Sequence, residues 1–143
     1  MNEALSRSTG AKVSFTHFIA FAMIKALAQV PTMNATFVDA VDEKGTPGVI
    51  RHEHVGMGLA VDVGRPDGSR TLVVPVLRDA DTLDFAGFLA GYDALIRKVK
   101  DNKLAVADFQ GATVSLTNPG TIGTVQSVPR LMPGQGVIVG VGT

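Results

Sequence analysis

Two segments with helical periodicity, separated by short apolar runs, restrict the folds that this chain can adopt. In residues 15–30 apolar side chains recur at helical spacing, after a candidate N-cap at Ser14 and before Pro31, whose ring cannot continue a helix. In residues 85–99 the apolar side chains form one stripe, and Asp84 precedes them as a candidate cap. These helical segments interleave with apolar runs typical of strands, without strict βαβ repetition. The pattern therefore predicts an α/β domain.

The apolar positions also predict which helix faces pack on the core. In the first helix they are Phe15, Phe18, Ile19, Ala22, Met23, Ala26, Leu27 and Val30. In the second they are Phe85, Phe88, Leu89, Tyr92, Leu95, Ile96 and Val99. The second helix ends with Arg97, Lys98 and Lys100, where cations favour the negative end of the helix dipole. We interpret this basic cluster as a solvated helix end rather than a phosphate site.

The apolar runs between the helices predict paired strands. Residues 55–63 and 71–77 are both apolar, and the loop between them contains Asp67-Gly68, a strong hairpin signal. We expect these two strands to pair antiparallel. A further strand is expected over residues 35–41.

The last third of the chain predicts two more strands around a loop rich in Gly and Pro. Residues 112–118 alternate, so that Ala112, Val114 and Leu116 lie on one face and Thr113, Ser115 and Thr117 on the other. Residues 137–141 form the closing apolar strand. Residues 1–143 are therefore expected to form one domain with a mixed or largely antiparallel sheet.

Composition narrows the possible functions. Thirteen basic residues balance thirteen acidic ones, so no net positive field is available for nucleic acid or for an acidic membrane. The absence of Cys excludes disulfides, a catalytic thiol and a Cys-based zinc site. Residues 1–12 are too polar for a signal peptide, and the longest apolar stretch, residues 18–28, is too short to cross a bilayer. These features are typical of a soluble cytoplasmic protein.

The three histidines do not assemble into an obvious site by spacing. His17 is expected in the first turn of the first helix, as a surface or capping residue. His52 and His54 would share one strand face, but a metal needs at least one further ligand and Glu53 points the other way. The spacing therefore predicts no metal site.

The stretch from Ser115 to Thr124 leaves two interpretations open. Asn118-Pro119-Gly120 is ordinary turn chemistry, and composition alone favours a structural strand end. Alternatively, the Thr117 hydroxyl projects into a site, because loops at strand ends often carry function.

Segments along nearly the whole chain resemble one enzyme family. The resemblance is to the catalytic domain of dihydrolipoyl acyltransferases. It is carried by residues 113–123, 127–132 and 136–140, together with residues 13–18, 30–35, 72–76 and 101–111. These are the core components of 2-oxo acid dehydrogenase complexes. The resemblance implies a chloramphenicol acetyltransferase-like α/β fold, a two-layer mixed β-sheet with packed helices. Residues 115–132 are most similar to the succinyltransferase-type domain of actinobacterial multifunctional 2-oxoglutarate dehydrogenases.

This resemblance implies transfer of an acyl group, here succinyl, between a dihydrolipoyl arm and coenzyme A, both of them substrates. It implies the lipoyl domain, the 2-oxoglutarate dehydrogenase decarboxylase and dihydrolipoyl dehydrogenase as partners, with thiamine diphosphate and Mg confined to the decarboxylase, outside this chain. The family assembles from homotrimers. Two alternatives remain: a non-catalytic core or assembly domain, and an acyltransferase of the same fold for acetyl or branched acyl groups.

The resemblance assigns one catalytic residue. In the family a Ser or Thr directly before the motif's Asn stabilises the oxyanion, which carries over to Thr117. The family's base is a His in a His-x-x-x-Asp-Gly motif, expected beyond Thr143, and its first strand is expected before residues 1–12. We therefore expect an internal piece of the domain, truncated at both ends and inactive alone. Arg51 and Arg130 are candidates for coenzyme A contacts, although a surface role is favoured for each.

Overall fold

The computed structural model describes Arg7 and residues 12–143. The expectation that residues 1–12 are too polar for a signal peptide concerns a segment of which only Arg7 and Lys12 are among the described residues. Helix α2 (Phe15–Gln29) starts after Ser14 and ends before Pro31, as expected, and a short 3-10 helix that was not predicted begins at Pro31. None of the helices in the described part of the chain is long and apolar enough to cross a membrane.

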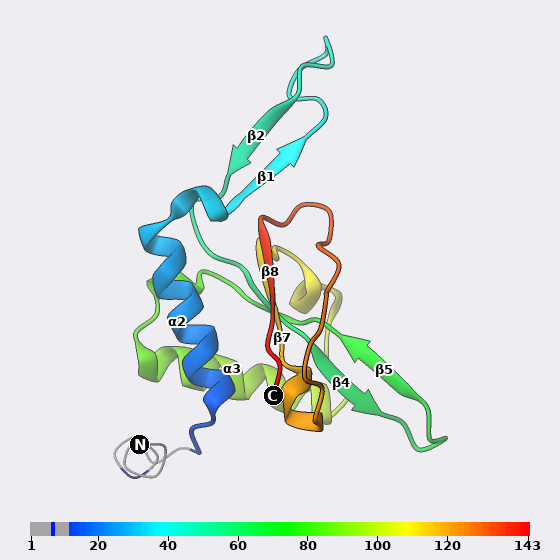
Figure 1. The fold of residues 1–143 in the computed structure, drawn as a ribbon. Coiled ribbons are helices and arrows are strands. Elements are labelled where there is room, and N and C mark those ends of the chain that lie inside the picture. The colour runs from blue at the N-terminus through cyan, green and yellow to red at the C-terminus, as the bar shows by residue number, and fades with distance from the viewer. Residues whose placement is uncertain (1–6, 8–11) are drawn as a thin grey trace.

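A four-stranded mixed sheet forms the centre of the molecule (Figure 1). Its order is β6 (Val76–Leu77), β3 (Met57–Leu59), β7 (Val114–Thr117) and β8 (Val137–Gly140). Strand β3 runs parallel to β7, and β7 runs parallel to β8, whereas β3 and β6 are antiparallel. The expected mixed sheet is confirmed, and so are the strands predicted near residues 112–118 and 137–141.

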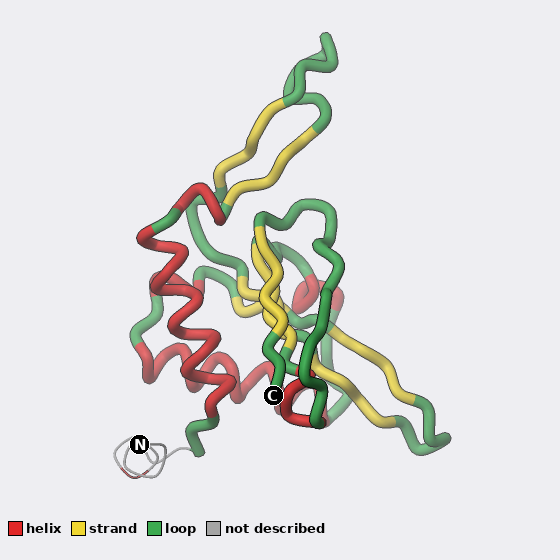
Figure 2. The backbone as a smooth tube through the Cα atoms, viewed as in Figure 1, coloured by secondary structure: helices red, strands yellow, loops and turns green. Residues whose placement is uncertain are grey.

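Two hairpins project from this centre in different directions (Figure 2). The first pairs β1 (Ala35–Val38) with β2 (Gly48–Arg51), and the second pairs β4 (Val61–Gly64) with β5 (Arg70–Val73). The antiparallel pairing predicted around the Asp-Gly turn is confirmed, but each apolar run is divided into two strands that belong to different sheets. Strand β2 had no counterpart among the predicted strands.

The helices cover one face of the sheet, and α3 (Phe85–Lys100) uses the predicted stripe: Phe88, Leu89, Leu95 and Val99 are buried. For α2 the predicted face is confirmed in part: Leu27 is buried, and Phe18, Ile19 and Met23 pack against the core. The other buried residues, His17, Ala20 and Ile24, were not predicted, and Phe15 is 69% exposed. The helix is apolar almost all round, so periodicity did not distinguish the buried face. Short 3-10 helices occur at Pro31–Met33, Ala80–Thr82, Val106–Phe109 and Pro119–Ile122.

The two faces of β7 have different surroundings. Val114 and Leu116 are buried in the hydrophobic core with Met57 and Leu59 of β3. Ser115 and Thr117 point to the opposite face, as the alternation predicted, where they line a cavity. The strand therefore carries the core on one side and a candidate site on the other.

Candidate functional site

Thr117 lies where the central sheet ends. It is the last residue of β7, beside Gly140 of β8, and its carbonyl oxygen accepts a hydrogen bond from Val141 N at 2.9 Å. The side chain is half-buried, and among the described residues its hydroxyl has no hydrogen-bond partner. A fixed backbone thus presents an uncommitted hydroxyl donor.

Two cavities meet at this residue. One has a volume of about 690 Å³ and the other of about 420 Å³. Thr117, Ala60 and Leu72 line both of them. A group bound in either cavity can therefore approach the Thr117 hydroxyl.

The larger cavity is built over the outward face of β7. Ser115 is buried and donates a hydrogen bond of 2.7 Å to Gln135 Oε1, which holds the loop before β8 against the strand. Arg130 and Met132 of the same loop complete the wall. Arg130 brings a guanidinium that can meet an anionic group. Arg51, by contrast, is exposed on β2 and lines neither this cavity nor the smaller one.

The smaller cavity lies between the start of α2, α3 and the β4–β5 hairpin. Its lining includes Asp62 and Arg70, whose Nε donates to Asp62 Oδ2 at 2.7 Å and whose pKa this hydrogen bond raises. Tyr92 of α3 also lines it, and burial raises the pKa of the phenol. The Tyr92 hydroxyl therefore remains protonated at neutral pH.

His17 is buried, which corrects the expectation of a surface residue, while its predicted capping role is confirmed. The side chain is 6% exposed, and its Nδ1 accepts a 2.9 Å hydrogen bond from Ser14 N. The ring packs edge-on against Tyr92, and its Nε2 lies 3.7 Å from Asp93 Oδ1. Burial lowers the pKa of His17 and outweighs the charge of Asp93, which would raise it. The neutral ring is therefore the stable form.

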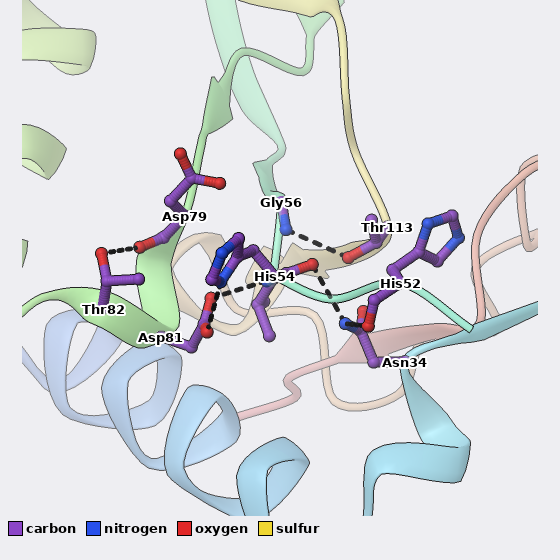
Figure 3. Close-up of polar contacts among 9 residues, drawn as sticks. Asn34, His52, His54, Gly56, Asp79, Asp81, Thr82 and Thr113 are labelled. Carbon is purple, nitrogen blue, oxygen red and sulfur yellow. Dashed lines mark hydrogen bonds and ion pairs between the residues drawn. The ribbon is translucent and has the colours of Figure 1, made fainter.

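His52 and His54 are held in separate polar contacts, and Figure 3 shows that of His54 with Asp81. His52 Nε2 lies 3.0 Å from Thr36 Oγ1. Because the Thr36 hydroxyl donates to Gly134 O at 2.7 Å, the imidazole is the donor in its contact with Thr36. His54 Nδ1 lies 3.1 Å from Asp81 Oδ2, and this hydrogen bond raises the pKa of His54.

Asp81 anchors the second of these contacts. Burial alone would raise the pKa of Asp81, but hydrogen bonds from Val55 N and His54 outweigh it, and the pKa lies below its ordinary value. Asn34 donates to the carbonyl oxygens of both His52 and His54 and fixes the backbone between them. In the part of the chain that the structure describes, no three acidic or His residues gather as a metal site would require.

None of the three histidines lines either cavity that contains Thr117. The cavities also contain residues that sequence reasoning did not single out: Gln135, Asn118 and Thr16. Thr16 and Asn118 lie within segments that carry the family resemblance, which is the signal that could have identified them, whereas Gln135 lies just before one.

Comparison with known sequences identifies the family. Residues 1–143 match the sequence model of the 2-oxoacid dehydrogenases acyltransferase (catalytic domain) family. The chain belongs to this family. It is 49% identical over 142 residues to a "Multifunctional 2-oxoglutarate metabolism enzyme" of Mycobacterium sp. (strain JLS), covering 99% of this chain and 11% of that protein. It is 48% identical over 143 residues to a "2-oxoglutarate dehydrogenase E1/E2 component" of Corynebacterium glutamicum, covering 100% of this chain and 12% of that protein.

Solved structures support the same family and fold. A probable dihydrolipoamide acetyltransferase from Listeria monocytogenes 4b F2365 superposes with a TM-score of 0.76 at 25% identity, over 94% of this chain and 52% of that one. A truncated catalytic core of the 2-oxoacid dehydrogenase multienzyme complex from Thermoplasma acidophilum gives 0.72 at 29% identity, over 97% and 60%. The acyltransferase chain thus spans between half and two thirds of these solved neighbours and about a ninth of its curated relatives.

Proposed function

We propose that this chain is part of a dihydrolipoyl succinyltransferase domain of a 2-oxoglutarate dehydrogenase, which transfers a succinyl group between dihydrolipoamide and coenzyme A. The observation that carries the proposal is the Thr117 hydroxyl, which has no hydrogen-bond partner in the described part of the chain and lies on a wall common to two cavities. Two thiol substrates must meet at one carbonyl in this reaction, and two cavities that meet at one hydroxyl suit that requirement. The printed names of the relatives support the 2-oxoglutarate substrate.

The chemistry assigns Thr117 a defined step. A base removes the proton of the acceptor thiol, and the thiolate attacks the thioester carbonyl. The resulting tetrahedral oxyanion accepts a hydrogen bond from the Thr117 hydroxyl. The intermediate then expels the donor as a thiolate, which regains the proton from the base. Both reacting thiols belong to substrates, which fits a chain without Cys.

We further propose that the base comes from outside these 143 residues, and that this chain is an internal part of the domain. The engagement of all three histidines elsewhere supports this. So does the limited share of each solved neighbour that the chain covers. The thiamine diphosphate-dependent decarboxylase would be a fused or partner unit, in line with the "E1/E2" name of one relative.

A trimeric assembly in which a neighbouring copy completes the site is part of the proposal. Exposed apolar side chains around the larger cavity support it, namely Leu72, Phe109, Val128, Leu131 and Met132. Such residues are typical of surfaces that are covered by a partner.

The test is Thr117→Ala in the longer polypeptide. Succinyl transfer from succinyl coenzyme A to dihydrolipoamide should fall roughly 10²–10³-fold, with an unchanged sedimentation coefficient. Equal transfer rates in variant and parent would remove Thr117 from the mechanism. The 143-residue chain alone should give no transfer, and transfer at the parent's rate would refute the external base. A longer polypeptide that assembles but transfers no succinyl group would favour the alternative of a non-catalytic assembly domain.

A further inference from the structure

The residue after Thr117 ties the strand end to a distant helix. Asn118 Nδ2 donates a 2.9 Å hydrogen bond to Thr16 Oγ1 in the first turn of α2, across 102 positions of sequence. Both side chains are half-buried, and both line the smaller cavity together with Thr117. The contact therefore lies in the wall of the proposed site itself.

The backbone leaves the sheet at this point. Thr117 is the last residue of β7, and Asn118 leaves the extended conformation with φ −125° and ψ 75° before the 3-10 helix begins at Pro119. Ladder hydrogen bonds end with the Thr117 carbonyl, which accepts from Val141 N. Beyond that bond, Gly120 N donates to Val141 O at 3.1 Å, and the Asn118 side chain connects the strand end to α2.

The other end of the tie is itself anchored. Thr16 precedes His17, which closes the first turn of α2 through Ser14 and packs against Tyr92 with ring centroids 4.3 Å apart. Because Tyr92 belongs to α3, both helices fix the position of the Thr16 hydroxyl. The arrangement forms a continuous chain of contacts from α3 through α2 to the end of β7.

We propose that Asn118 and Thr16 form a positioning pair, which holds the Thr117 hydroxyl where the oxyanion of the thioester intermediate develops. The inference rests on the proposed role of Thr117. An oxyanion donor acts only when it lies about 2.7–3.1 Å from the developing charge. A misplacement of about 1 Å can cost on the order of 10²-fold in rate. Loss of the tie should therefore lower kcat and leave KM for both substrates nearly unchanged.

The experiment compares two variants that break the tie from opposite sides in the longer polypeptide. Asn118→Ala and the shape-conserving Thr16→Val should each lower kcat roughly 10–100-fold with KM within about twofold. Thr16→Ser, which retains the hydroxyl, should restore kcat. Thr71→Val is the matched control, because Thr71 is equally half-buried but lines neither cavity at Thr117.

The decisive measurement repeats Thr16→Val in a Thr117→Ala background. If the pair acts through Thr117, the double variant transfers no more slowly than Thr117→Ala alone. If Thr16→Val lowers kcat in the Thr117→Ala background as much as it does in the parent, the proposal is overturned. Full kcat in both Asn118→Ala and Thr16→Val would also overturn it. If Thr117→Ala retains full kcat, both the proposed function and the positioning pair are refuted. If Thr117→Ala loses kcat as expected while Asn118→Ala and Thr16→Val do not, only the positioning pair is refuted.

Discussion

Gly56 is the position where a single methyl group should most disturb the sheet that carries the site. An ideal Cβ on Gly56 would lie 1.8 Å from Gly111 O, so the two segments must separate by at least about 1.2 Å to reach 3.0 Å. Three hydrogen bonds cross this contact: Gly56 N to Thr113 Oγ1 at 3.0 Å, Thr113 N to Gly56 O at 2.9 Å and Val114 N to Gly56 O at 3.2 Å. Their loss costs about 0.5–1.5 kcal/mol each, or roughly 1.5–4.5 kcal/mol together.

Gly56→Ala should therefore lower the melting temperature of the purified chain by on the order of 5–20 °C, measured by circular dichroism. Amide hydrogen exchange at Thr113 and Val114 should accelerate, because those amides bond across the contact. Gly64→Ala is the matched control, since a Cβ there has no neighbour within 4 Å. That variant should keep or slightly raise the melting temperature. Indistinguishable melting temperatures for the two variants would refute the reasoning.

Three further predictions concern the helices. Lowering the pH from 7 to 5 should reduce the melting temperature of the parent more than that of His17→Gln. The reason is that the pKa of His17 is lowered in the folded chain, so that the unfolded chain binds the extra proton. Asp84→Ala should cost about 0.5–2 kcal/mol in denaturant titrations, since Asp84 Oδ1 accepts from Gly87 N at 2.7 Å; a cost near zero would deny the cap. Phe88→Ala should cost about 3–5 kcal/mol because Phe88 is fully buried, whereas exposed Phe15→Ala should cost little.

Local features of the sequence predicted local structure well. The start of each helix follows from the capping residues Ser14 and Asp84, and the β4–β5 pairing follows from the Asp67-Gly68 turn. Each of these signals acts within a few residues of the chain. Their physical cause is therefore contained in the segment that shows the pattern.

The arrangement of the strands could not be predicted in the same way. Met57 lies beside Val114 in parallel register, although the two residues are more than 50 positions apart in the sequence. The residues near Met57 contain no local signal that indicates this pairing. Strand β2 is exposed and short, and it is a strand because β1 offers it hydrogen bonds rather than because of its apolar pattern. In α2 the buried residues His17, Ala20, Ile24 and Leu27 recur at heptad spacing, but exposed apolar residues such as Phe15 repeat around the helix as well. A histidine among the buried residues also concealed their pattern.

The outward face of β7 shows why residue type and spacing alone left Thr117 undecided. Three hydroxyl residues alternate there, and the sequence presents them as equivalent. Thr113 is buried, accepts from Gly56 N and lines neither cavity, and Ser115 donates its hydroxyl proton to Gln135. Thr117 alone keeps its hydroxyl free among the described residues, at the point where the ladder ends and two cavities meet. The partners that distinguish the three lie 20 or more residues away along the chain. The capacity to donate to a substrate is therefore decided by distant partners, which only the folded chain brings into place.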